Sequence, residues 1–150
     1  CRQCTAGLRD DPTYPGSGAG SDQRLGKFYG GVTEQFVAFA AFQFELSALQ
    51  DDGATLRDHL EMYQARSARM HPKMAAAPAL PAGCDLLWAD FLDLHGTRQF
   101  REHGPAPITF VDLDAWQRVN RVSLPAWQIN AIRRADAAYL ASVAKAVRDD

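Results

Sequence analysis

The stretch that decides the fold is residues 124–147, LPAWQINAIRRADAAYLASVAKAV. Its apolar side chains recur every three or four positions, which is the spacing of one face of an α-helix. Ser123 just before it and Pro125 near its first turn are typical of a helix start. The sequence therefore predicts a long amphipathic helix with an apolar face formed by Ile129, Ile132, Tyr139, Leu140, Val143 and Val147.

Asp136 lies within this apolar stripe. A buried carboxylate without a partner is too costly to persist, so its position predicts a nearby arginine, amide or helix N-terminus. The nearest candidate donors are the free backbone amides expected at residues 109–112. The alternative is that the stripe is shallow at this point and water reaches the carboxylate.

Three more segments upstream have helical patterns. Residues 55–70 and 109–122 each begin with a threonine, Thr55 or Thr109, as the expected N-cap, with an aspartate three positions later. Residues 85–95 end at a glycine, and residues 55–70 end before a proline. These are common signals for the starts and ends of helices. The residues expected to support the helical packing are Thr109 as an N-cap, Trp88, Trp116, Trp127 and Asp136, with Trp116 and Trp127 between the last two helices.

Residues 33–50 are rich in phenylalanine and permit two interpretations. Phe42, Phe44 and Leu46 alternate with polar residues as in a strand, whereas the length and the alanine content favour a helix, with Thr33 as its cap. The apolar surplus is either a central core helix or a surface for a partner. The residues predicted to bind that partner are Phe36, Phe39, Phe42, Phe44 and Leu46.

Residues 1–31 contain eight prolines and glycines between Pro12 and Gly31, which disfavour both helix and strand. We therefore expect a Gly/Pro-rich arm or linker at 1–31 and a helical domain at 32–150. The predicted fold is all-α: a small bundle of four to five helices with an irregular N-terminal arm.

The composition is that of one soluble globular domain, with 150 residues of which 47% are hydrophobic and 23% charged. The longest apolar run, residues 36–42, is too short to span a bilayer, and no secretory signal opens the sequence. The net charge is −2, and charges nearly balance in residues 109–150. This balance argues against a nucleic-acid partner, although two helices joined by a turn occupy that region.

Cys1 and Cys4 have the spacing of two zinc ligands, but the sequence has no second pair of this kind. Their simpler interpretation is two free thiols, so they are weak candidates for a metal site. No catalytic serine motif or phosphate-binding loop is present. The sequence therefore predicts no cofactor and no enzymatic activity.

Several stretches together resemble one family, the tail assembly chaperones of long-tailed bacteriophages. The similarity is carried by LLWADFLDLH at 86–95, PITFVDLDAW at 107–116, LPAW at 124–127 and RADAAYL at 134–140. Residues 55–60, TLRDHL, resemble the element that precedes them. The order and spacing of these pieces, over about residues 53–145, carry more weight than any one of them.

This resemblance implies a non-enzymatic assembly factor in the host cytoplasm, which binds the helical tape measure protein and recruits the tail tube protein. It implies no membrane partner and leaves self-association open. The alternatives are a structural component of the virion tail or neck, or a small zinc- or DNA-binding protein.

Overall fold

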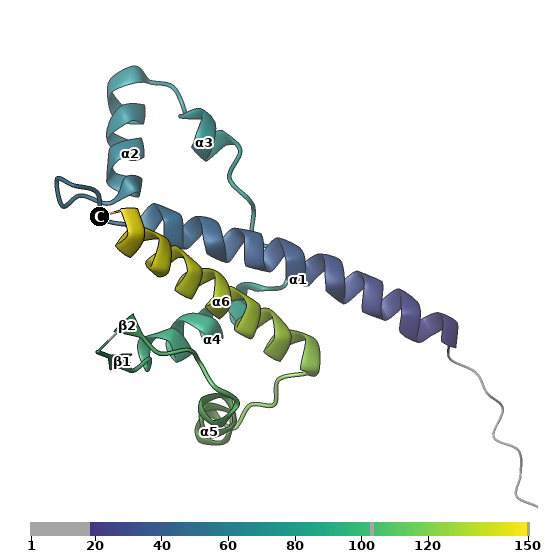
Figure 1. Cartoon of the computed structure of the whole chain (residues 1–150). Coiled ribbons are helices and arrows are strands. Elements are labelled where there is room, and N and C mark those ends of the chain that lie inside the picture. Colours follow the sequence, from purple (N-terminus) through teal and green to yellow (C-terminus); the bar gives the residue numbers. More distant parts are fainter. Residues whose placement is uncertain (1–18, 103, 150) are drawn as a thin grey trace, which may run out of the picture.

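The computed structural model describes residues 19–102 and 104–149 (Figure 1). In chain order, its elements are α1 (Ala19–Ser47), α2 (Leu56–Ser67), α3 (Pro72–Ala75), α4 (Asp85–Gly96), β1 (Phe100–Arg101), β2 (Gly104–Pro105), α5 (Phe110–Asn120) and α6 (Ala126–Asp149). The all-α prediction is confirmed, with five long helices and the single turn α3 in the described residues. The strands β1 and β2 form a short antiparallel hairpin in which Phe100 lies opposite Pro105.

Helices α1 and α6 form the long axis of the fold and run in the same direction (Figure 1). Tyr29, in the first half of α1, stacks on Trp127 at the start of α6, with ring centroids 5.0 Å apart. Further along, the Phe44 ring meets Tyr139 at 5.2 Å. Because partners occur in the same order on both helices, the pairing is parallel, and the elements from α2 to α5 form the connection between the two.

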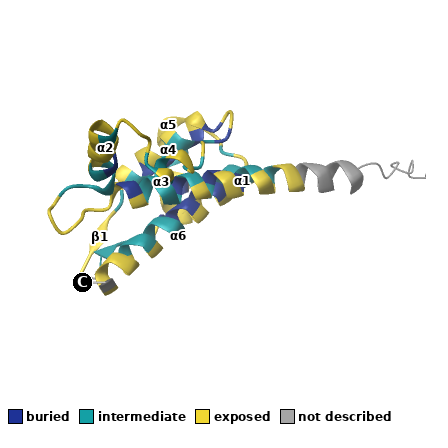
Figure 2. Ribbon diagram, turned by 90° about the horizontal axis from the view of Figure 1, so that it is seen from above, coloured by how far each residue is buried: buried dark blue, intermediate teal, exposed yellow. Residues whose placement is uncertain are grey.

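The core lies where α4, α5 and α6 meet the second half of α1. Figure 2 shows buried residues on the facing sides of α1 and α6. Ala40, Ala131 and Ala135 are completely buried, so small side chains let these helices approach closely. The rest of the core cluster consists of Phe36, Cys84, Leu87, Phe91, Leu94, Ile108, Leu113 and Ile132.

Two helix starts follow the capping pattern seen in the sequence. Thr55 caps α2 and Thr109 caps α5, and in each case the aspartate three positions later bonds back to the threonine backbone. Asp58 and Asp112 therefore each complete a capping box, which satisfies amides that a helix leaves free at its start. Both caps confirm the prediction from sequence.

The expected irregular structure of residues 19–31 is wrong. These residues form the first turns of α1, and Thr33 is a buried residue within the helix rather than its cap. Helix extension from an existing segment is cooperative, and the stacking of Tyr29 on Trp127 holds this end, so the cost of the glycines is overcome. The rest of the expected arm, residues 1–18, lies outside the described residues.

The expected connection between the second and third helices also differs. Helix α2 ends at Ser67 rather than near residue 70, because Ala68 adopts a left-handed conformation with φ 51°. The chain then forms α3, in which His71 acts as N-cap and Pro72 occupies the first turn. The sequence pattern treats Pro72 only as the end of a helix, whereas proline is equally suited to the start of one.

Gly30 and Gly31 lie in α1, and a Cβ atom at either position would have no neighbour within 4 Å. We expect Gly30→Ala and Gly31→Ala each to raise the free energy of unfolding by about 0.5–1 kcal/mol, because alanine loses less backbone entropy in a helix. Chemical denaturation measures this change.

Gly83→Ala is the matched control, because Gly83 has φ +79° and alanine would be strained there. It should lower stability. A failure of both α1 variants to stabilise the chain would contradict a helical start of α1.

Candidate functional site

A buried ion pair joins the segment after α4 to the middle of α6. The Arg98 guanidinium donates through Nη2 to Asp136 Oδ1, and the two side chains are only 2% and 5% exposed. The backbone N–H of Ile108 donates to the other carboxylate oxygen at 2.9 Å. Both oxygens of Asp136 therefore have donors, and these come from the segments on either side of the β1–β2 hairpin.

Arg98 makes further contacts that fix its position. Its Nη1 donates to the carbonyl of Ala106, and its guanidinium lies over the Tyr139 ring, 4.8 Å from the centroid. Its Nε is buried and has no hydrogen-bond partner in the described residues. A planar guanidinium can bond several groups in its plane while its face stacks on a ring, whereas the ammonium of lysine has no planar face to stack.

The prediction of a buried and partnered Asp136 is confirmed, but its expected donors are not the ones that bind it. The amide of Thr109 donates to Asp112 Oδ2 at 2.7 Å, and the amide of Asp112 donates to Thr109 Oγ1 at 3.2 Å. The capping box therefore uses the amides of Thr109 and Asp112, and the amide that binds Asp136 is that of Ile108. Arg98 is not singled out by the sequence pattern because it follows the end of α4 and belongs to no stripe.

His95 borders the ion pair. Its Nδ1 lies 3.2 Å from Arg98 Nη2, and its ring meets the Tyr139 ring edge-on at 4.4 Å. Burial lowers the pKa of His95, the positive charge of Arg98 lowers it further, and the negative charge of Asp136 opposes both. The neutral ring suits this position, because its unprotonated Nδ1 can accept a hydrogen bond from the guanidinium.

The residues predicted to bind a partner occupy different environments. Phe36 and Leu46 are buried at 0% and 1% exposure, and Phe44 is packed among the rings of Trp88, Phe91 and Tyr139. This supports the core interpretation of those three residues. Phe39 and Phe42 are half-buried, so partner binding by these two stays a prediction.

The three tryptophans that are expected to support the helical packing contact different neighbours. Trp88 packs against Phe36, at 6.1 Å between ring centroids, and against Phe39, at 5.1 Å. Trp116 donates from Nε1 to Asp93 on α4 at 2.6 Å. Trp116 thus contacts α4 and Trp127 contacts α1, and both pack against the core cluster, so their expected packing between the last two helices stays a prediction.

The candidate metal ligands Cys1 and Cys4 lie outside the described residues. Cys84 is a buried free thiol, and burial raises its pKa. Within residues 19–102 and 104–149, no three His, Cys, Asp or Glu side chains are arranged to hold a metal ion. None of the described helices is long and apolar enough to cross a membrane.

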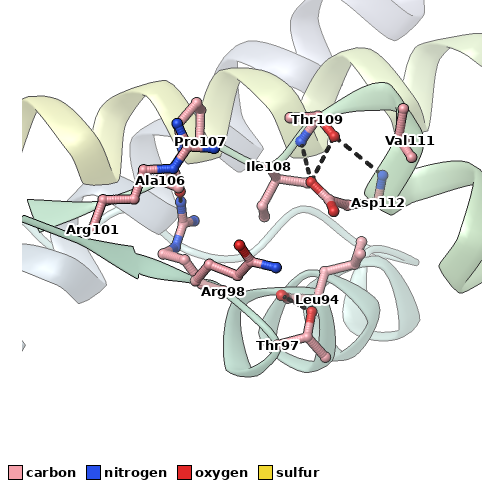
Figure 3. A pocket seen from close by; sticks show the side chains of 11 residues that line it. Leu94, Thr97, Arg98, Arg101, Ala106, Pro107, Ile108, Thr109, Val111 and Asp112 are labelled. Atoms are coloured by element: carbon pink, nitrogen blue, oxygen red, sulfur yellow. Dashed lines mark hydrogen bonds between the residues drawn. The ribbon is translucent and has the colours of Figure 1, made fainter.

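A small cleft lies beside the ion pair, between the end of α4 and the start of α5, and Arg98 is one of the residues that line it. Figure 3 shows the reciprocal hydrogen bonds of Thr109 and Asp112 beside it. Thr97, Arg101 and Val111 also line this cleft. Hydrogen bonds of the capping box and the ion pair already engage Thr109, Asp112 and Arg98, which line this cleft.

The sequence model of a family described as phage tail assembly chaperone matches residues 63–141, which is more than half of the chain. The match runs from within α2 into α6 and includes the whole Arg98–Asp136 pair. This chain therefore belongs to the phage tail assembly chaperone family, as the resemblance in its sequence indicated. Neither a curated protein nor a solved structure matches it.

Membership in this family assigns the chain a role in tail assembly and indicates a non-enzymatic activity that involves protein partners.

We expect Asp136→Leu to lower the free energy of unfolding by about 3–5 kcal/mol, because it leaves the Arg98 charge buried and unpaired. Thermal and urea denaturation measure the loss. Asp114→Asn, which breaks an exposed pair with Arg118, is the control and should change stability little. Unchanged or raised stability of the Asp136 variant would show that the ion pair is dispensable.

The lowered pKa of His95 predicts that acidification destabilises the fold. Below the ordinary pKa of 6.5, the unfolded chain binds a proton that the folded chain does not, so stability falls as the pH drops from that value. His95→Gln should remove this part of the pH dependence in denaturation curves between about pH 7 and 5. An identical slope in the variant would contradict the assignment.

Proposed function

We propose that this chain binds the tape measure protein and recruits the tail tube protein during assembly of a phage tail, in the host cytoplasm. The observation that carries the proposal is the family match over residues 63–141. The match includes α4, α5 and most of α6, the three elements that the buried ion pair joins.

Phe42 is the sharpest probe of the predicted partner surface on α1. Phe36 and Leu46 cannot reach a partner while the core is intact, because they are fully buried. Phe42 lies between them along the chain, is half-buried, and makes no ring contact within the described residues. An amphipathic helix of a partner could therefore cover Phe42 without unfolding the chain.

The experiment is co-expression of this chain with the tape measure and tail tube proteins, followed by affinity purification of the tagged chain. We expect both proteins to co-purify with it. Phe42→Asp should reduce recovery of the tape measure protein at least tenfold, since it places a charge in an apolar contact. Circular dichroism of the variant should match that of the original chain.

Leu49→Asp, at a side chain that is 72% exposed near the end of α1, is the matched surface control and should retain both partners. Phe36→Asp is the core control and should lose the fold. Absence of the tape measure protein from the original complex would refute the proposed binding. Detection of the chain in purified virions would favour the structural alternative.

A further inference from the structure

Helix α5 carries an apolar stripe that faces away from the core. Leu113 and Trp116 lie toward the core, where Leu113 is buried and Trp116 bonds to α4. On the opposite side, Val111 and Val119 are 75% and 81% exposed, and Ala115 between them is also exposed. Valine and alanine four positions apart share one helix face, so this stripe is continuous. We call Val111, Ala115 and Val119 the α5 stripe.

The position of α5 leaves its stripe open to another molecule. Figure 1 shows α5 at the edge of the fold, away from α1, and Figure 2 shows exposed residues on it. The capping hydrogen bonds of Thr109 and Asp112 do not involve the stripe. Although Val111 also borders the cleft beside α4, most of the surface of both valines is exposed. Contiguous exposed apolar side chains usually mark a contact surface.

Charges along α5 change sign at the middle of the helix. Asp112 and Asp114 lie in its first half, whereas Arg118 lies in its last turn and Arg121 is its C-cap. Asp114 and Arg118 form an exposed pair at 2.8 Å on one flank of the stripe. The helix is thus acidic at one end and basic at the other, with a small residue, Ala115, near its centre.

We propose that the α5 stripe binds the same stripe of a second copy of this chain, with the two helices antiparallel. A two-fold axis near Ala115 places Val111 of one copy opposite Val119 of the other. On the flank of the stripe, the same axis places Asp114 of each copy beside Arg118 of the other, which gives two ion pairs between the copies. The alanine at the crossing lets the helices approach closely, and the two ion pairs select the antiparallel orientation.

The charge pattern is the reason to assign this surface to a second copy. A helix that is acidic at one end and basic at the other is complementary to itself when reversed, whereas a partner of one charge sign would repel one end. The contact of two 11-residue helices is small, so the dimer belongs to the weak, concentration-dependent class. This self-association does not depend on the proposed function.

The test is sedimentation equilibrium of the purified chain alone, from about 10 µM to 1 mM, the range in which an interface of this size should associate. We expect a reversible monomer–dimer equilibrium. Val119→Glu should raise the dissociation constant at least tenfold. Val147→Glu, at a 73% exposed residue of α6, is the matched control and should leave it unchanged. Circular dichroism should show that both variants are folded.

Two charge-reversal variants distinguish an ion pair between copies from the ion pair within one chain. Asp114→Arg and Arg118→Asp each remove the internal pair and should each weaken self-association. An equimolar mixture of the two variants should restore dimers, because the arginine introduced in one variant faces the aspartate introduced in the other. The internal pairs remain broken in that mixture, so only the contact between copies can account for the recovery.

A chain that is monomeric at about 1 mM would overturn the proposal, because even a weak interface should be occupied at that concentration. Dimers that survive Val119→Glu, or charge-reversed variants that do not associate when mixed, would also overturn it. A monomeric chain whose Val119→Glu variant loses the tape measure protein would assign the stripe to that partner instead. If the original chain forms dimers but does not retain the tape measure protein, only the proposed function is contradicted.

Discussion

The negative charge of Asp136 must be neutralised inside an apolar interface, and the packing of the C-terminal half of the chain meets this requirement. Arg98 and the amide of Ile108 approach the carboxylate from the two sides of a short hairpin. To bring both donors to one side chain, the end of α4 and the start of α5 must lie against the same turn of α6. We infer that the pair thereby favours one arrangement of three helices among those that apolar packing alone would permit.

The sequence predicts those parts of the fold that depend on local patterns. The spacing of Ile129 and Ile132, the capping residues Thr55 and Thr109, and the glycine that ends α4 each report on a few neighbouring residues. The requirement for a partner at Asp136 also follows from the sequence, since burial of a charge has a general cost.

The partner itself could not be predicted, because Arg98 is 38 residues away and lies outside any periodic pattern. The helical structure at the start of α1 could not be predicted for a similar reason. Its glycines disfavour a helix locally, and Trp127, which stabilises this end, is about a hundred residues downstream. Phe36 and Leu46 are buried whereas Phe42 is half-buried, although all three belong to one apolar segment. The elements that pack against α1 decide which of these side chains stay accessible.

The parallel pairing of α1 with α6 has a consequence for biosynthesis. Glu34 of α1 bonds to Arg134 of α6, a partner 100 residues later in the chain. At a translation rate of about 5–20 residues per second, roughly 5–20 s pass between the synthesis of Glu34 and that of Arg134. Trp88 and Phe91 of α4, which pack on Phe44, are made about halfway through this interval. Tyr139, its neighbour on α6, follows only with the last helix, so the apolar face of α1 stays incomplete until that helix emerges.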